Sequence, residues 1–147
     1  MKSIRIIRNT ILSLLGTRTI GARILLIKNN KILLVKHTYQ PGWYTIGGAV
    51  ERGESPLKAI ERELKEEVGV TLTTLPQLFS IYYSKFEKRD DYIVLYVGSE
   101  HIEEMSSSNE IAEKKWFDLD NLPEDVTPAT KRRINEYRST IMINDIW

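Results

Sequence analysis

Three glutamates, Glu63, Glu66 and Glu67, lie within five residues of one another in the chain. On a helix that turns about 100° per residue, these carboxylates cluster on one stripe and repel one another unless a cation lies between them. Carboxylate oxygens are the ligands that hard divalent cations such as Mg²⁺ bind. The spacing predicts a metal site. The alternative is a solvated face on which Arg62 and Glu66 form an ordinary i,i+4 pair.

A helix that would carry these acids is predicted over residues 55–68. Ser55 is a suitable N-cap, Pro56 fits the first turn, and Gly69 fits the position that ends the helix. Four apolar residues recur at helical spacing and predict the face that packs against the core: Leu57, Ile60, Leu64 and Val68.

Residues 48–70 resemble the signature of the Nudix hydrolases. The signature reads Gly, five residues, Glu, seven residues, Arg-Glu, an apolar residue, any residue, Glu-Glu, any residue, Gly and an apolar residue. Its fixed positions are all filled, by Gly48, Glu54, Arg62, Glu63, Leu64, Glu66, Glu67, Gly69 and Val70. So many constrained positions at one spacing rarely match by chance. One departure is Ile46, where family members often carry proline before the paired glycines.

The resemblance implies an α/β (α+β) fold, the Nudix α/β/α sandwich with a mixed sheet between helices. It also implies a Mg²⁺-dependent pyrophosphohydrolase, with Mn²⁺ as a substitute, acting on a nucleoside diphosphate linked to another group. The implied metal ligands are the carboxylates of Glu63, Glu66 and Glu67 and the backbone carbonyl of Gly48. Glu63 and Glu66 are also the expected catalytic acids, with Glu63 as the leading candidate for the general base.

Two further residues of the motif are expected to support catalysis by pairing with each other. Glu54 would accept a salt bridge from Arg62 and so pin the loop to the helix. Beyond the motif, Glu110 precedes Trp116 by six residues. By resemblance to some family members, Glu110 could supply a further metal ligand or base, with an ordinary surface glutamate as an equal alternative. Its rivals for that role are Glu113, Asp90 and Asp91.

Candidates for substrate binding are His37, Trp43, Tyr83 and Phe86. Tyr83 and Phe86 adjoin a loop rich in cations, although a strand with an ordinary charged hairpin is the favoured interpretation. His37 follows a strand that leads toward the motif, and Trp43 is either a pocket wall or a packing anchor. A small nucleotide is mildly favoured as substrate, and capped RNA ends stay open.

Length and composition allow one domain, predicted over residues 17–147. A net charge of +1 provides no global field that recruits nucleic acid or an anionic membrane. The absence of cysteine excludes disulfides and thiolate metal sites and fits a reducing, cytoplasmic location. No apolar run is long enough to span a membrane.

Residues 1–16 predict an amphipathic helix, with apolar residues at Ile4, Ile7, Ile11 and Leu14. The apolar face of this helix could pack on the domain, which is favoured, join a homodimer, or touch a membrane surface.

Other elements follow from alternation and turn signals. Residues 19–27 and 31–36 predict a hairpin around Asn29-Asn30. Residues 44–50 carry the paired glycines into the motif. Strand character is found over residues 70–83 and 92–97, and residues 114–117 predict a short strand. A turn of helix is expected over residues 118–122 and a longer helix over residues 128–143.

Two other functions compete with the hydrolase. One is a non-catalytic module that binds nucleotide or RNA on the same scaffold. The other is an interaction protein that works through the N-terminal helix. The complete set of acids argues against the first, because binding alone has no need of three clustered carboxylates.

Overall fold

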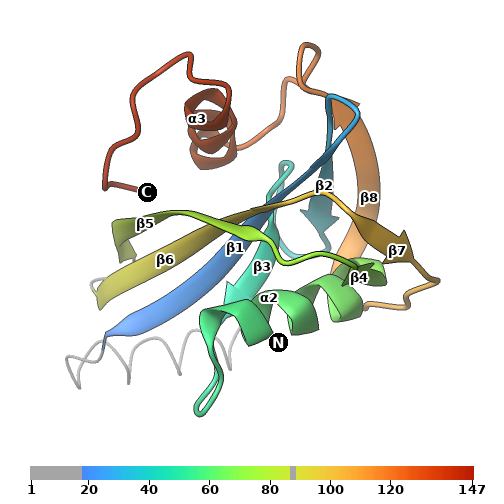
Figure 1. The fold of residues 1–147 in the computed structure, drawn as a ribbon, viewed down its shortest axis with the longest axis horizontal. Helices are drawn as coiled ribbons and strands as arrows, with labels where there is room; N and C mark the ends of the chain where they lie inside the picture. Colours follow the sequence, from blue (N-terminus) through green and yellow to red (C-terminus); the bar gives the residue numbers. More distant parts are fainter. Residues whose placement is uncertain (1–17, 87–88) are drawn as a thin grey trace.

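The computed structural model describes residues 18–86 and 89–147. A mixed sheet lies between helix α2 (Pro56–Glu63), continued by η1 (Leu64–Val68), on one face and α3 (Pro128–Tyr137) on the other (Figure 1). This arrangement confirms the predicted sandwich. The predicted helix over residues 1–16 lies outside the described residues. Within the described part, no helix is long and apolar enough to cross a membrane.

Six strands build the main sheet, in the order β5-β6-β1-β2-β8, with β3 paired to β1. Their bounds are β1 (Thr19–Lys28), β2 (Lys31–His37), β3 (Ile46–Ala49), β5 (Gln77–Phe86), β6 (Arg89–Gly98) and β8 (Ile111–Asp118). β1 runs parallel to β6, and the other pairs are antiparallel. A second, two-stranded sheet joins β4 (Val70–Leu72) to β7 (His101–Glu103).

The hairpin between β1 and β2 is confirmed. Asn29 and Asn30 have φ angles of 52° and 60°. A two-residue turn with both φ angles positive has the twist that neighbouring antiparallel strands need.

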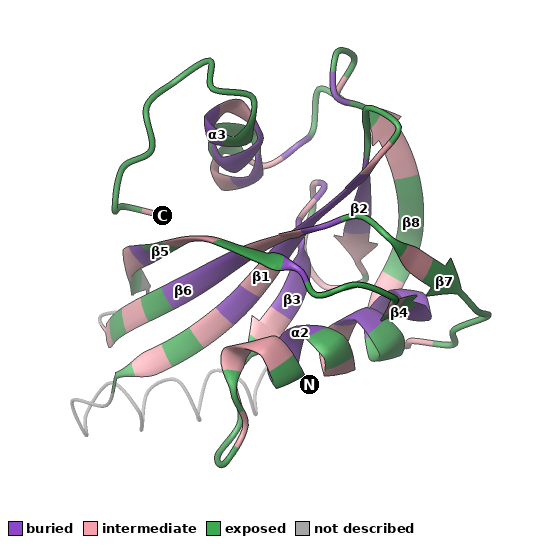
Figure 2. Cartoon of the chain, viewed as in Figure 1, coloured by how far each residue is buried: buried purple, intermediate pink, exposed green. Residues whose placement is uncertain are grey.

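The sheet has a core on each face because side chains alternate along a strand. Ala22, Ile24 and Leu26 of β1 pack with α2, whereas Leu25 and Ile27 pack on the side of α3. Figure 2 shows buried residues in the central strands, in η1 and in α3. The sheet is thus packed on both faces, and β3 contacts α2.

The helix of the motif begins and ends where the sequence predicts. The Ser55 side chain accepts a hydrogen bond from the Lys58 N–H at 3.2 Å, and Pro56 follows in the first turn. Gly69 ends the helix with a φ of 71°. The interior differs from the prediction, because the α-helix stops at Glu63 and a π-helical turn continues to Val68. Such wider turns are frequently found at functional sites.

Three predicted elements need correction. The strand predicted over residues 70–83 is divided into β4 and β5, with Pro76 in the connection between them. Residues 118–122 form the end of β8 and a turn and contain no helix. α3 ends at Tyr137, and Ser139 follows in the left-handed region with a φ of 57°. A helix that has reached a left-handed residue does not continue.

The C-terminal tail runs beside the edge of β5 (Figure 1). The Tyr83 N–H donates to the Asp145 carbonyl at 2.6 Å, and the Trp147 N–H donates to the Tyr83 carbonyl at 2.9 Å. Below the tail, the guanidinium of the fully buried Arg133 pairs with Glu136 at 3.0 Å. The tail therefore covers strand groups that an exposed edge would leave open.

Candidate catalytic site

A bidentate salt bridge joins the loop of the motif to its helix, as expected. Arg62 Nε and Nη2 donate to the two carboxylate oxygens of Glu54 at 2.8 and 3.0 Å. The hydrogen bond from Arg62, helped by the Glu51 N–H, lowers the pKa of Glu54 to about 2. Arg62 Nη2 also donates to the Ala49 carbonyl at 3.0 Å, so one guanidinium connects β3, the loop and α2.

Glu63 lies against the paired glycines of β3. Its side chain is 15% exposed, and Arg62 Nη1 donates to its Oε1 at 2.8 Å. Burial raises the pKa of Glu63, while the charge and hydrogen bond of Arg62 oppose that effect. A Cβ added to Gly48 would lie 2.3 Å from Glu63 Oε1, which is far inside contact distance. Glycine at position 48 therefore makes room for the carboxylate.

Glu67 is the most deeply placed acid of the group. The residue is 7% exposed, and its Oε2 accepts a hydrogen bond from the Gly47 N–H at 3.3 Å. Burial, helped by the nearby charge of Glu63 and opposed by the positive charge of Arg23, raises the pKa of Glu67 to about 7. A buried carboxylate of this kind needs a positive partner to stay ionised.

The acids line an open cavity of about 530 Å³. One wall is the π-helical turn and the other is the loop between β7 and β8. The lining residues are Glu63, Lys65, Glu66, Glu67, Met105, Ser106, Ser107, Ser108 and Glu110. The structure thus brings Glu110, which lies far along the chain from the motif, to the same cavity as the helical acids.

The rivals of Glu110 take other contacts. Asp91 accepts a hydrogen bond from Thr19 Oγ1 at 2.7 Å, and Asp90 accepts one from the Tyr83 hydroxyl at 2.9 Å. Glu113 lies opposite Lys36 in the ladder between β2 and β8.

The chemistry of these donors suits a hard divalent cation, since carboxylates and a backbone carbonyl are its preferred ligands. In the described part of the chain, however, no group of three Asp, Glu, His or Cys side chains converges closely enough to hold an ion. Arg62 contacts Glu63 and, at 3.4 Å, Glu66, while Gly47 contacts Glu67. The carboxylates would have to turn from these partners to bind a cation, and the missing side chain of Gly48 leaves space for that.

His37 and Trp43 have different surroundings. The His37 ring packs 5.0 Å from Tyr39 and 5.1 Å from Tyr44. The adjacent Thr38 N–H donates to the Glu110 carbonyl at 2.9 Å, which places the end of β2 beside the cavity loop. Trp43 is 4% exposed and packs edge-to-face with Phe117 at 4.7 Å between ring centres. This geometry fits the packing interpretation of Trp43 that the sequence slightly favours.

The other two aromatic candidates lie on β5, which is separated from β3 by β6 and β1. The Tyr83 ring packs 5.7 Å from Tyr92, and its hydroxyl donates to Asp90. These contacts fit the favoured interpretation, in which Tyr83 is an ordinary strand residue beside a charged hairpin. The side chain of Phe86 lies outside the described residues, as does Lys88 of the neighbouring loop.

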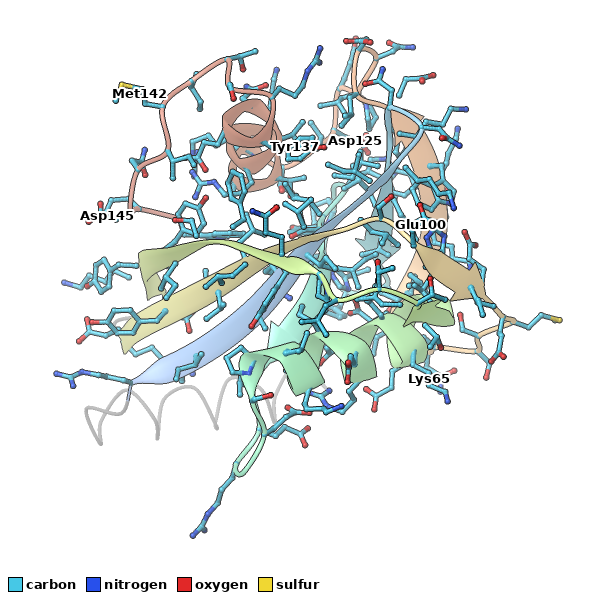
Figure 3. The ribbon with its side chains drawn as sticks, in the orientation of Figure 1. Lys65, Glu100, Asp125, Tyr137, Met142 and Asp145 are labelled. Atoms are coloured by element: carbon cyan, nitrogen blue, oxygen red, sulfur yellow. The ribbon has the colours of Figure 1, made fainter. Side chains whose placement is uncertain are left out.

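Sequence reasoning did not single out Arg23, Lys65 or the serines of the cavity loop. Lys65 points from η1 away from the sheet (Figure 3) and lines the cavity. Arg23 influences the pKa of both Glu63 and Glu67. The sequence signal for Arg23 was that it is the single charged residue in the stretch Gly21–Ile27. The signal for Lys65 was its position in the motif, between Leu64 and Glu66.

A family model for the NUDIX domain matches residues 17–137. The chain therefore belongs to the Nudix hydrolase family.

Curated relatives differ in the substrates that their names state. The chain is 31% identical over 116 residues to the "Putative 8-oxo-dGTP diphosphatase" of Bacillus subtilis, covering 79% of this chain and 76% of the relative. It is 34% identical to the "ADP-ribose pyrophosphatase" of Methanocaldococcus jannaschii, covering 65% of this chain and 59% of the relative. It is 33% identical to the "NAD-capped RNA hydrolase NudC" of Vibrio vulnificus, covering 65% of this chain but 37% of the relative.

Solved structures share the fold. A NUDIX hydrolase from Nitrosomonas europaea superimposes with a TM-score of 0.74 at 20% identity, covering 88% of this chain and 99% of the other. A MutT NUDIX hydrolase from Burkholderia pseudomallei gives 0.71 at 23% identity, covering 81% and 97%.

Proposed function

We propose that this protein is a divalent-metal-dependent hydrolase that cleaves the pyrophosphate bond of a nucleoside diphosphate linked to another group. The observation that carries the proposal is the gathering of Glu63, Glu66, Glu67 and Glu110 around one open cavity. Family membership supports the reaction class, because the relatives are named as diphosphatases, pyrophosphatases and hydrolases.

The chemical problem is charge, since a polyphosphate repels an attacking anion. A Mg²⁺ ion held here, or Mn²⁺ in its place, would screen the phosphate oxygens and lower the pKa of bound water. Glu63, Glu66, Glu67 and the Gly48 carbonyl would hold the cation, with Glu110 as a further oxygen ligand from the opposite wall. The oxygen chemistry of the cavity and the space beside Gly48 support these roles.

Within this proposal Glu63 removes the proton from the attacking water. Burial raises the pKa of Glu63, and a raised pKa makes a carboxylate a stronger base. Arg62 and Glu54 keep the helix and loop in register, so that the carboxylates hold their positions relative to β3.

The substrate is proposed to be a small nucleotide derivative. The names of the relatives extend from an oxidised nucleoside triphosphate to ADP-ribose and NAD-capped RNA, so a test must include each class. Turnover should be measured on nucleoside triphosphates, dinucleoside polyphosphates, ADP-ribose, nucleotide sugars and NAD-capped RNA, with Mg²⁺, with Mn²⁺ and with chelator.

The same assay tests the acids. Glu66→Gln and Glu67→Gln should each lower kcat by about 10²-fold or more, because each removes a charged oxygen ligand of the proposed cation. Glu61→Gln is the matched control, because Glu61 lies on the same helix but pairs with Lys58 on the surface at 2.6 Å. Folded wild-type protein that binds nucleotide yet turns over nothing with either metal would favour the binding module instead.

The cytoplasmic location, the domain boundary at residue 17 and a homodimer stay predictions. Sedimentation of the full chain and of a chain lacking residues 1–16 would measure whether that segment holds two copies together.

A further inference from the structure

Arg23 is a charged residue in the middle of β1, flanked by small and apolar residues. Its neighbours across the sheet are Gly47 of β3 and Leu95 of β6. Side chains alternate along a strand, so Arg23 lies on the same face as Leu25, which packs on the side of α3. The guanidinium therefore belongs to the face opposite α2.

The half-buried Arg23 differs in its contacts from two other arginines that are at least partly buried, Arg62 and Arg133. Arg62 and Arg133 each donate to a carboxylate, of Glu54 and Glu136 respectively. Within the described residues, no hydrogen bond or ion pair joins Arg23 to another group. A guanidinium carries five N–H donors in a rigid fork that matches phosphate oxygens. This arrangement leaves the fork available to a ligand rich in acceptors.

Gly47 is the link between Arg23 and the catalytic acids. The Gly47 N–H donates to Glu67 Oε2 at 3.3 Å, so this edge of β3 turns toward the acids while the other edge pairs with β1. With a φ of +135°, an added Cβ would lie 2.1 Å from the Ala22 carbonyl oxygen. Position 47 thus carries no side chain that could separate the guanidinium from whatever lies at the edge of β3.

We propose that Arg23 binds the polyphosphate of the substrate from the face of the sheet opposite α2. The phosphate chain would pass the edge of β3 at Gly47, with the catalytic acids on one side and the guanidinium on the other. A planar fork matches two phosphate oxygens at once and stabilises the negative charge that the leaving phosphate gains. The ligand class is a compound with at least two linked phosphates, and the inference rests on the proposed function.

The test compares Arg23→Met and Arg23→Lys with wild type, and Arg132→Met serves as the matched control because Arg132 is exposed on α3. The probe is methylenediphosphonate, a pyrophosphate analogue that lacks a nucleobase and whose bridge resists hydrolysis. It is titrated into each protein in the presence of Mg²⁺, and calorimetry gives its Kd. Arg23→Met should raise its Kd about 10- to 100-fold, the usual loss for a hydrogen-bonded charge. Arg23→Lys should recover part of that loss, and Arg132→Met should match wild type.

Steady-state kinetics separate binding from a structural effect. On a substrate that wild type cleaves, loss of the phosphate contact should raise KM or lower kcat/KM by a similar factor, with an unchanged melting temperature. If Arg23→Met does not fold, Arg23→Lys and Arg23→Gln decide by the same comparison.

Two failures have different meanings. Wild-type affinity and KM in the Arg23 variants would overturn the role of Arg23 and leave the hydrolase proposal intact. A folded wild type that neither binds the analogue nor cleaves any substrate of the panel would overturn the proposed function, and the role of Arg23 with it.

Discussion

Replacing Glu67 with glutamine should stabilise the metal-free protein at pH 8 and have much less effect at pH 5. Glu67 is 7% exposed, and burial raises its pKa from 4.5 to about 7. In the unfolded chain the carboxyl ionises near its ordinary value. Between the two values the unfolded state has lost the proton that the folded state still holds, so the free energy of unfolding falls as pH rises.

The size of the effect follows from that interval. Each pH unit is worth about 1.4 kcal/mol, so an interval from 4.5 to about 7 amounts to about 3 kcal/mol. The loss begins above the unfolded pKa and is complete once the pH exceeds the folded pKa. Glutamine has nearly the same shape and no charge, and therefore removes this loss.

Urea unfolding in chelator, repeated from pH 5 to pH 8.5, measures the effect as the difference between the variant and wild type. That difference should grow by about 3 kcal/mol over this interval, because only wild type carries the ionised carboxylate. Glu61→Gln, at a half-exposed side chain on the same helix, should change the pH dependence little. Parallel curves for wild type and Glu67→Gln would refute the claim that burial perturbs Glu67.

Three further substitutions test other parts of the structure. Gly48→Ala should lower kcat by about 10²-fold or more, because its Cβ would lie 2.3 Å from Glu63 Oε1 and would displace that carboxylate. Gly21→Ala, with its nearest contacts at 3.7 Å, should retain wild-type kcat in the same assay. Arg62→Lys should lower kcat or apparent metal affinity about 10- to 100-fold, because an ammonium cannot form the bidentate bridge to Glu54. Activity equal to wild type would exclude the role of Arg62 in positioning the loop and helix. Arg133→Met should lower the melting temperature by about 10 °C, because it leaves a buried carboxylate unpaired. An unchanged melting temperature would show that the C-terminal tail and α3 do not depend on this ion pair.

Local signals in the sequence predicted the two ends of the motif's helix. Ser55, Pro56 and Gly69 act through their own backbone and nearest neighbours, so no knowledge of the rest of the fold was needed. The end of α3 was predicted too late because the residues after Tyr137 are compatible with a helix, and the left-handed Ser139 carries no strong local signal.

Contacts between distant segments were harder to predict. Glu110 reaches the cavity through the loop between β7 and β8, and β7 itself was not foreseen because three residues give no usable alternation. Arg23 lies opposite Gly47 only because β1 pairs with β3 in this particular register. Such a register is decided by the packing of both faces of the sheet.

The π-helical turn explains why the motif's acids experience different environments. Leu64 and Val68 begin and end this turn and are both fully buried, so the turn is anchored to the core at each end. Between them, Glu67 is directed inward to the Gly47 N–H, while the Glu66 side chain is 61% exposed beside Arg62. Two adjacent carboxylates thus differ in solvation, and burial raises the pKa of Glu67. A cation bound here would offset the desolvation of the Glu67 carboxylate, so the burial of Glu67 favours cation binding. The same cation would have to compete with Arg62 for Glu66, so this ion pair opposes cation binding.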